Sequence, residues 1–269
     1  MPEGPEVKKT VDWLQNFKGK TLESVGIISG RYGKKKEIPG WERFVFPVLL
    51  KDINCKGKFI YFTFSDDTED YFMFNTLGMS GMWSNVHSKH ARVVFFFTDA
   101  EPLYFIDIRS FGTLKVVNSL NDLNKKLKSL GHDVLKTNVD WQEFKRVFNK
   151  KPNKTITECL MNQCVVSGVG NYLKAEILYS SKISPHRLVK NIKDEEWQNL
   201  HHNTLAQSRR SYMLGGATIA TYRQPNGDEG LYNRRFAVYN QKTCPEGCNV
   251  IKEQTADKRT THWVPEIQK

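Results

Sequence analysis

The first residues of the chain contain a potential nucleophile. The sequence begins Met1-Pro2-Glu3-Gly4-Pro5, and loss of Met1, which the small second residue permits, would make the ring nitrogen of Pro2 a free secondary amine. Such an amine attacks an electrophilic sugar carbon and forms an iminium. A terminal α-amine has a pKa near 7.7–8.0, so roughly 10–15% of it is unprotonated at neutral pH, against on the order of 0.05% of a lysine. The pattern therefore favours covalent chemistry at Pro2.

The same residues also fit the start of a helix. Pro5 suits the first helical position, where its missing N–H is not needed, and Glu6 suits the first turn. Four apolar residues follow at helical spacing: Val7, Val11, Leu14 and Phe17. The two interpretations are compatible, because a helix N-terminus beside the amine disfavours its protonated form.

The composition indicates a polyanionic partner. The chain has 269 residues, enough for two modest domains, and its 40 Lys+Arg against 29 Asp+Glu give a formal charge of +11. The isoelectric point near 9.3 lies in the range of nucleic-acid-binding proteins. Basic residues concentrate in Arg31–Lys36, Lys145–Lys154 and Arg187–Lys193. Together with 12% aromatic residues, they favour a polyanion as partner over a protein that is merely basic.

No segment of the sequence has the pattern of a membrane span or a secretory signal. No apolar run approaches the roughly 20 residues that a bilayer requires, and no apolar core follows a basic start. The five cysteines are an odd number without the spacing of a disulfide framework, which fits a reducing compartment. We expect a soluble intracellular protein, and the sequence does not distinguish a nuclear from a cytoplasmic or viral compartment.

The first half of the chain has the pattern of strands. Residues 21 to about 117 contain β-branched and aromatic runs such as Lys58–Phe64, Tyr71–Phe74, Val93–Phe97 and Leu103–Ile108, separated by turn clusters. This spacing predicts a β-sandwich or barrel. With the N-terminal helix it forms a first domain over residues 1–130.

The second half is helical and ends in a small hairpin module. From Asn118 to Asp140 the composition changes, and a linker is expected around Leu130–Asp133. Residues 131–214 form a helical domain, with one helix around Trp141–Phe148 and a last helix over Leu188–Leu214. Residues 215–269 are turn-rich and short-stranded. The expected fold class is therefore α+β and multidomain.

A glycine pair lies between two expected helices, at 155–165 and 171–181. In Val166-Ser167-Gly168-Val169-Gly170-Asn171, Gly168 and Gly170 would let the backbone approach another surface closely. The N–H groups and positive dipole end of the helix that starts near Asn171 would then form a phosphate site. The alternative is an ordinary tight turn between packed helices.

These segments together resemble a known family. Pro2-Glu3-Gly4-Pro5-Glu6 with Gly168-Val169-Gly170-Asn171 is similar to the formamidopyrimidine-DNA glycosylase and endonuclease VIII (Fpg/Nei) family of base-excision repair enzymes. The resemblance extends through the whole chain. Four further segments match the family. Asn75–Met82 resembles the segment with its intercalating methionine, and Asp107–Gly112 resembles the segment with its arginine and phenylalanine. Gly57-Lys58 matches its strand-start lysine, and Gly215–Thr218 matches the entry to its lesion-recognition loop. It implies a helix–two-turn–helix domain, a C-terminal finger hairpin, damaged DNA as partner, and a monomer.

The resemblance implies a set of residues that fill the DNA stack. Chemistry at the sugar requires the base to be turned out, which leaves a hole. Met79 and Phe111 are apolar wedges, and the guanidinium of Arg109 has donors for the orphaned partner base. Strand alternation would put Arg109 and Phe111 on the same face. The alternative is that Met79 and Phe111 belong to the core and that Arg109 is an ordinary surface residue.

The resemblance also implies a mechanism. Pro2 attacks the sugar C1′, Glu3 protonates the ring oxygen, and Glu6 supports the geometry around the amine. Lys58 contacts a phosphate and transfers a proton during elimination. The activity is that of a bifunctional DNA glycosylase and AP lyase with β- and then δ-elimination, without a metal or an organic cofactor.

Contacts with DNA are expected from several polar positions. The resemblance assigns phosphate binding to Asn171, Gly170 and Arg259, and the guanidinium geometry suits that role at Arg259. His90 is expected to contact DNA, and Arg92 either contacts DNA or supports the structure.

The finger hairpin departs from the common family pattern. Family members usually end in a zinc finger with four cysteines, whereas this chain has Cys244 and Cys248 and, at best, His262 as a third ligand. Structural zinc needs four ligands. We therefore expect no metal, and the better match is the zincless-finger, Nei-like branch, as in vertebrate and giant-virus members.

The choice of damaged base is left open by the sequence. Gly4, where the purine-directed branch usually has Leu, favours oxidised pyrimidines and hydantoins. The loop from Ala217 to Arg235 keeps a substantial length, so an oxidised-purine specificity of the Fpg type remains an alternative. Tyr222 and Arg223 are candidates to touch the extruded base. A non-catalytic helix–two-turn–helix protein that binds nucleic acid and keeps Met1 is the rival from another class.

Overall fold

The computed structural model describes residues 2–35, 37–66, 68–136, 138–218 and 223–269. The chain divides into two compact units that interleave in sequence. The β unit comprises Met1–Pro2, Glu6–Ser129 and Thr218–Gly230, and the helical unit comprises Glu3–Pro5, Leu130–Ala217 and Leu231–Lys269. The three consecutive domains expected from the sequence, over residues 1–130, 131–214 and 215–269, stay a prediction.

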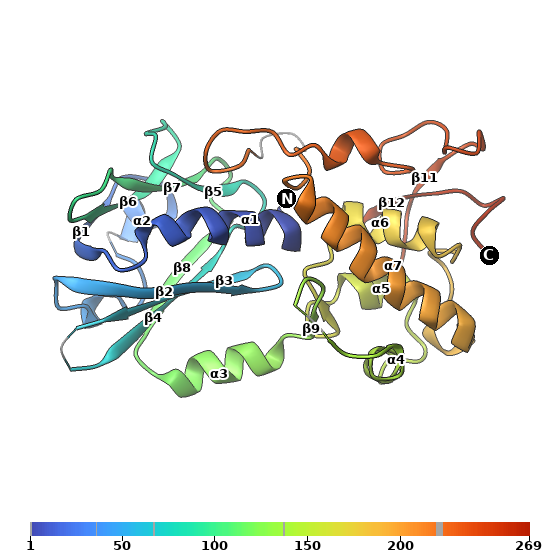
Figure 1. Cartoon of the computed structure of the whole chain (residues 1–269), viewed down its shortest axis with the longest axis horizontal. Helices are drawn as coiled ribbons and strands as arrows, with labels where there is room; N and C mark the ends of the chain where they lie inside the picture. The colour runs from blue at the N-terminus through green and yellow to red at the C-terminus, as the bar shows by residue number, and fades with distance from the viewer. Residues whose placement is uncertain (1, 36, 67, 137, 219–222) are drawn as a thin grey trace. The chain divides into compact units, whose positions relative to one another are not determined.

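The β unit is built on one antiparallel sheet (Figure 1). Its described strands are β1 Thr21–Ile27, β2 Val48–Lys56, β3 Phe59–Ser65, β4 Asp70–Thr76, β5 Gly81–Ser84, β6 Ala91–Phe97, β7 Leu103–Asp107 and β8 Thr113–Val117. Their order in the sheet is β5-β7-β6-β1-β2-β3-β4-β8. Most of them coincide with the aromatic and β-branched runs of the sequence, since such side chains pack well on a pleated surface.

The sheet folds back on itself to form two layers. Trp83 on β5 is fully buried, and its ring centroid lies 5.4 Å from that of Phe62 on β3. Four strands separate β5 from β3 in the sheet order, so this contact requires that the two halves face each other. Phe95 and Phe105 also pack on Trp83, at 5.2 Å and 5.1 Å between ring centroids. The predicted β-sandwich is confirmed.

Helix α1, Gly4–Leu14, continues into the short 3-10 helix η1, Gln15–Phe17. The predicted apolar stripe is confirmed, because four side chains at helical spacing are buried in the core of the β unit: Val7, Val11, Leu14 and Phe17. This burial fixes the first helix on the sandwich.

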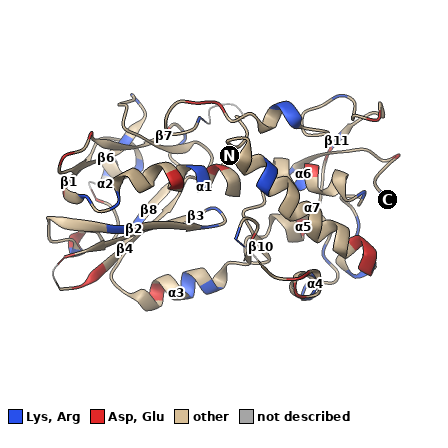
Figure 2. Cartoon of the chain, in the orientation of Figure 1, with Lys and Arg blue, Asp and Glu red and all other residues tan. Residues whose placement is uncertain are grey.

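Three elements of the β unit are absent from the sequence prediction: α2 Gly30–Lys35, η2 Trp41–Arg43 and α3 Leu120–Ser129. Helix α3 lies in the stretch that we interpreted only as a change in composition. Its residues Leu120, Leu123 and Leu127 have helical spacing, although only Leu123 is buried, and its basic residues are prominent in Figure 2. Lys126 Nζ lies 5.3 Å from the ring centroid of Phe59, which ties α3 to the sheet.

The helical unit contains the remaining elements. They are β9 His132–Asp133, α4 Trp141–Phe148, α5 Ile156–Met161, β10 Val166–Ser167, α6 Asn171–Ser180, η3 Val189–Asn191, α7 Asp194–Met213, η4 Tyr232–Arg235, β11 Ile251–Gln254 and β12 Thr260–Trp263. The expected linker forms β9, which pairs in parallel with β10. The last two strands form the predicted antiparallel finger hairpin.

Helix α6 is the centre of the helical unit, because every residue from Tyr172 to Tyr179 is buried. Helix α7 begins at Asp194, later than predicted, and packs Trp197 on Phe148 with 5.3 Å between ring centroids. Figure 2 shows acidic residues at the start of α7 and basic ones near its end, as the helix dipole favours. None of the helices in the described ranges has the length and apolar character to cross a bilayer.

Candidate active site

The carboxylate of Glu3 binds the N-terminus of α6. Its oxygens accept the N–H groups of Gly170 at 2.6 Å, Tyr172 at 2.9 Å and Leu173 at 3.3 Å. The positive end of the helix dipole favours a negative charge at this point. Three donors of the phosphate site expected at this helix start are thus bound to the chain's own carboxylate, and phosphate binding by Gly170 stays a prediction.

Glycines make this close approach possible. A Cβ on Gly170 would lie 2.3 Å from Cδ of Glu3, and a Cβ on Gly4 would lie 3.0 Å from Cα of Gly168. The Gly4 N–H donates to the carbonyl of Gly168 at 2.8 Å. The glycine pair does admit another surface, as predicted, but the surface is the start of the chain. Since Pro2 is bonded to Glu3, its Cα is held about 3.8 Å from an anchored residue.

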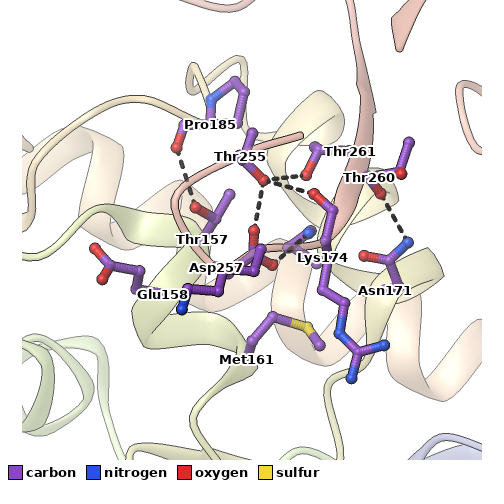
Figure 3. Close-up of polar contacts among 12 residues, drawn as sticks. Thr157, Glu158, Met161, Asn171, Lys174, Pro185, Thr255, Asp257, Thr260 and Thr261 are labelled. Atoms are coloured by element: carbon purple, nitrogen blue, oxygen red, sulfur yellow. Dashed lines mark hydrogen bonds and ion pairs between the residues drawn. The ribbon is translucent and has the colours of Figure 1, made fainter. Parts of the chain in front are cut away.

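The finger hairpin meets the same helix. Asn171 Nδ2 donates to the carbonyl of Thr260 at 2.8 Å, as Figure 3 shows. The Asn171 side chain also hydrogen-bonds to the hydroxyl of Tyr239, which opposes the rise in the pKa of Tyr239 caused by burial. Arg259, directly before Thr260, is exposed. Two predicted phosphate-binding residues, Asn171 and Arg259, are thus brought to one place, while their contact with DNA stays a prediction.

The three predicted void-filling residues come together in the β unit. Met79 lies in the turn between β4 and β5, and Arg109 and Phe111 lie in the turn between β7 and β8. A Cβ on Gly78 would be 2.7 Å from the carbonyl carbon of Phe111, so the two turns touch. Arg109 Cζ lies 4.8 Å from the ring centroid of Phe111, a residue that is 54% exposed. The interpretation of Phe111 as a core residue is therefore excluded.

The reason for this arrangement differs from the predicted one. Strand alternation does not place Arg109 beside Phe111, because β7 ends at Asp107. Ser110, between them, has a φ of 55°, in the left-handed region that non-glycine residues seldom adopt. The turn around Ser110 brings the guanidinium and the ring together.

The buried carboxylate of Asp107 holds both turns. It accepts the Ser80 hydroxyl at 2.6 Å, the Gly112 N–H at 2.6 Å and the Arg109 N–H at 3.2 Å. No role was predicted for Asp107, although an acidic residue at the end of an apolar strand is a signal of a buried, hydrogen-bonded carboxylate. Its bonds fix the backbone on both sides of the exposed Arg109 and Phe111.

The basic residues before this turn have different positions. Arg92 donates to the carbonyls of Asp107 at 2.6 Å and Ile108 at 3.2 Å and to the Ser29 hydroxyl at 2.9 Å, which supports its structural role. The carbonyl of His90 accepts the Asp107 N–H at 3.0 Å, so the His90 backbone belongs to the same framework. Contact of the His90 side chain with DNA stays a prediction.

Lys58 and Glu6 lie on other elements. Lys58 occupies the two-residue turn between β2 and β3, and Gly57 before it has a φ of 58°, as the first position of a type II′ turn requires. Glu6 lies in the first turn of α1. The catalytic roles of Pro2, Glu3, Glu6 and Lys58 stay predictions.

Comparisons with known proteins identify the family. Sequence models of three formamidopyrimidine-DNA glycosylase domains match this chain: the N-terminal domain at residues 1–114, the H2TH domain at 130–223 and the C-terminal domain at 232–269. A formamidopyrimidine-DNA glycosylase of Prochlorococcus marinus (strain MIT 9312) is 36% identical over 186 residues, covering 67% of this chain and 63% of the relative. Another, of Shouchella clausii (strain KSM-K16), is 29% identical over 282 residues, covering 100% of this chain and 99% of the relative.

The chain belongs to the formamidopyrimidine-DNA glycosylase family. Solved structures agree with the fold class predicted from the sequence. The MutM (Fpg) protein of Thermus thermophilus has a TM-score of 0.87 and 27% identity, covering 99% of this chain and 98% of that one. Lactococcus lactis Fpg, solved with DNA that contains an abasic site, has a TM-score of 0.84 and 25% identity over 99% of each chain. The predicted enzyme class, a DNA glycosylase with AP lyase activity in base excision repair, is confirmed at the level of the family.

The residues of the finger do not fit the zinc site common in this family. Cys244 packs in an apolar cluster with Val238 and Val264, and its N–H donates to the Cys248 carbonyl at 2.9 Å. The ring of His262 packs on Tyr239 with 5.0 Å between centroids, and burial lowers the pKa of His262. Over the described ranges, no three His, Cys, Asp or Glu side chains gather in a metal-binding arrangement.

The loop predicted to recognise the lesion is described in part. Ala217 pairs with Leu231 at its base, and the Gly230 N–H donates to the Thr218 hydroxyl at 2.7 Å. Arg223 forms an ion pair with Glu229. Tyr222 lies outside the described residues. Contact of Arg223 with a base stays a prediction.

Proposed function

We propose that this protein is a bifunctional glycosylase and AP lyase that uses the nitrogen of Pro2 as its nucleophile. The observation that carries the proposal is the binding of Glu3 to the start of α6. A flexible chain terminus would be a poor catalyst, because reacting atoms must be held in place to gain the advantage of an intramolecular reaction. Three N–H bonds to the adjacent residue supply that restraint.

The chemistry follows from an amine at the sugar. The Pro2 nitrogen forms a bond with C1′ as the N-glycosidic bond breaks, and the base leaves with the bonding electron pair and gains a proton. The C1′–O4′ bond of the sugar then breaks, O4′ gains a proton, and the lone pair of the nitrogen forms the iminium. This iminium acidifies the C2′ hydrogen, so that β-elimination and then δ-elimination expel the two phosphates. Lys58 is the proposed proton carrier for these eliminations.

The three bonds to Glu3 bear on its role. Hydrogen bonds that N–H groups donate to a carboxylate favour its charged form. We therefore propose that Glu3 first of all holds the terminus and stabilises the cationic iminium beside it. Protonation of the ring oxygen by Glu3, with Glu6 supporting the amine, requires that Glu3 first loosen these bonds.

The cluster in the β unit supports base extrusion. Phe111 and Met79 supply apolar surface to replace the extruded base, and the neighbouring guanidinium of Arg109 supplies donors for the orphaned partner. Asp107 pre-orders both turns before DNA arrives. This cluster would thus act on the base stack, while the chemistry at the sugar is assigned to Pro2.

For the substrate class we propose oxidised and ring-opened purines. The relatives named above are formamidopyrimidine-DNA glycosylases, whereas the sequence argument for oxidised pyrimidines rested on Gly4. In the structure Gly4 packs against the backbone of Gly168, where a Cβ would lie 3.0 Å from Cα of Gly168, so it is no direct evidence of contact with a damaged base. Oxidised pyrimidines and hydantoins are therefore the second candidate class. A place in the Nei-like, zincless branch is supported by the poor fit of the finger residues to zinc.

The mechanism is tested by borohydride trapping on duplex DNA with an abasic site or a formamidopyrimidine. We expect a covalent adduct whose tryptic peptide carries the sugar on Pro2, and mass spectrometry should show that Met1 is absent. A version with an N-terminal tag should lose the adduct. Trapping that persists with the terminus blocked would rule out Pro2 as nucleophile and leave open another amine.

Two further measurements test the alternatives. Single-turnover excision of a formamidopyrimidine should be faster than that of thymine glycol, and the opposite order would assign the protein to pyrimidine lesions. A protein that keeps Met1, binds duplex DNA and forms no adduct would instead be the non-catalytic helix–two-turn–helix binder.

A further inference from the structure

Helix α6 contains a buried cation that the mechanism above does not use. The side chain of Lys174 is 0% exposed and that of Asp257 is 3% exposed, and Lys174 Nζ lies 2.6 Å from Asp257 Oδ2. Lys174 follows Asn171 by one helical turn, and Asp257 precedes Arg259 by two residues. The pair therefore links the helix that carries Asn171 to the turn that carries Arg259 (Figure 3).

Stability alone does not explain an ion pair at this depth. Burial lowers the pKa of Lys174, and the carboxylates of Asp257 and Glu3 oppose that effect. Removing two charges from water costs about as much as their attraction returns, and well-packed apolar residues often hold two elements together equally well. A directional contact differs from an apolar one because it fixes where each partner lies.

The bonds of Asp257 lead to the backbone of Arg259. Asp257 Oδ1 accepts the hydroxyl of Thr255 at 2.5 Å, and the N–H of Thr255 donates to the carbonyl of Arg259 at 3.0 Å. The Thr255 hydroxyl also lies 2.6 Å from that of Thr261. Figure 3 shows Thr255, Asp257 and Thr261 around Lys174.

Two side chains of α6 thus bind the chain on either side of Arg259. Lys174 holds Asp257 before it, and Asn171 holds Thr260 after it. Arg259 itself is exposed, so its backbone is fixed while its guanidinium faces solvent. Its positive charge also lowers the pKa of Lys174, as expected of cations that lie close together.

We propose that the Lys174–Asp257 ion pair positions Arg259 for a DNA phosphate. The inference rests on the proposed function, because it requires damaged DNA as substrate and the predicted contact of Arg259 with a phosphate of that DNA. Lys174 and Asp257 are positioning residues in this scheme and do not themselves touch DNA.

The test compares the salt dependence of DNA binding among variants. The logarithm of the association constant falls as the logarithm of the salt concentration rises, and loss of one phosphate contact makes this slope less steep by about 0.9. Relative to binding at 1 M salt, this corresponds to about eightfold weaker binding at 0.1 M salt. We expect this change for Arg259→Ala, measured by fluorescence anisotropy on a duplex with a tetrahydrofuran abasic-site analogue. The double variant Lys174→Met with Asp257→Leu removes both charges together, so that neither is left buried and unpaired. It should reproduce the Arg259→Ala result.

Addition of Arg259→Ala to the double variant should cause no further loss, because positioning matters only while Arg259 is present. General destabilisation of the fold would not depend on Arg259 in this way. As a matched control, Lys51→Gln with Asp70→Asn removes an exposed ion pair from the β unit and should leave the slope unchanged. If the double variant does not fold in a thermal melt, Thr255→Val breaks the link from Asp257 to the turn and should lower the slope in the same direction.

The outcomes separate this inference from the proposed function. The positioning role alone would be overturned if Arg259→Ala makes the slope less steep as expected while the folded double variant, or Thr255→Val, keeps the wild-type slope. Losses that add between the double variant and Arg259→Ala would overturn it as well. An Arg259→Ala protein with an unchanged slope would overturn the phosphate role of Arg259 and this inference together, while borohydride trapping would still report separately on Pro2.

Discussion

Substitution of Gly170 by alanine tests whether α6 positions Pro2, the proposed nucleophile. The added Cβ would lie 2.3 Å from Cδ and 2.4 Å from Oε1 of Glu3, far inside contact distance, so the carboxylate must leave the helix start. Two of the three bonds that it would lose are shorter than 3 Å, at 2.6 Å and 2.9 Å. At about 1.5 kcal/mol for each bond to a charged group, less about 0.5 kcal/mol for the stiffer unfolded chain, we expect a loss of about 2.5 kcal/mol in the free energy of unfolding.

The larger effect of Gly170→Ala should be on catalysis. Pro2 moves with Glu3, and a displacement of about 1 Å at a reacting group costs on the order of 100-fold in rate. Single-turnover borohydride trapping on an abasic-site duplex should therefore slow by about that factor. Urea denaturation measures the change in stability separately, and binding of an abasic-site analogue should change much less than the trapping rate.

Gly33→Ala is the matched control for this substitution. Gly33 lies in α2, and a Cβ there meets no atom within 4 Å. Because alanine favours a helix over glycine by up to about 1 kcal/mol, this variant should be slightly more stable and should trap at the wild-type rate. A Gly170→Ala protein that traps as fast as Gly33→Ala would refute the argument that α6 positions the terminus.

Three further substitutions or reagents probe other parts of the structure. Asp107→Asn turns an amide N–H toward a backbone or hydroxyl donor, so it should lower the free energy of unfolding by about 2 kcal/mol. It should also slow base excision more than abasic-site cleavage. Equal slowing of both reactions would contradict the role of Asp107 in ordering the void-filling turns. Trp83→Ala should lower the free energy of unfolding in urea by about 3–5 kcal/mol, since the ring is fully buried between the layers; a loss below about 1 kcal/mol would argue against the sandwich core. Burial raises the pKa of Cys159 to about 11, so about 0.1% of its thiol is thiolate at pH 8. Iodoacetamide should therefore modify the exposed Cys164 first, as measured by mass spectrometry. Modification of Cys159 before Cys164 in the folded protein would contradict this burial.

The sequence predicted the elements of the fold that have strong local patterns. The aromatic runs of the β unit and the stripe Val7 to Phe17 specify strands and a buried helix through their periodicity alone. Helix α3 was missed although Leu120, Leu123 and Leu127 stand at helical spacing, because the stretch was interpreted from its polar composition alone.

The candidate site was predictable by residue type but not by partner. Gly168 and Gly170 indicated a close approach, yet local sequence could not show that Glu3, 167 residues before Gly170, is what approaches. The turn at Ser110 likewise depends on a positive φ that strand alternation does not foresee. Lys174 was overlooked, although a lone lysine within an apolar helix is a signal of a buried, paired charge.

The long separation between Glu3 and its helix has a consequence for biosynthesis. Glu3 emerges from the ribosome well before α6 has been synthesised, and Asp257 follows Lys174 by a further 83 residues. Contacts so distant in sequence form late in folding, after the loops that separate them have closed. A nascent chain therefore orders its first residues only after most of the protein has been translated, which would delay the activity proposed for Pro2 until the fold that positions it is in place.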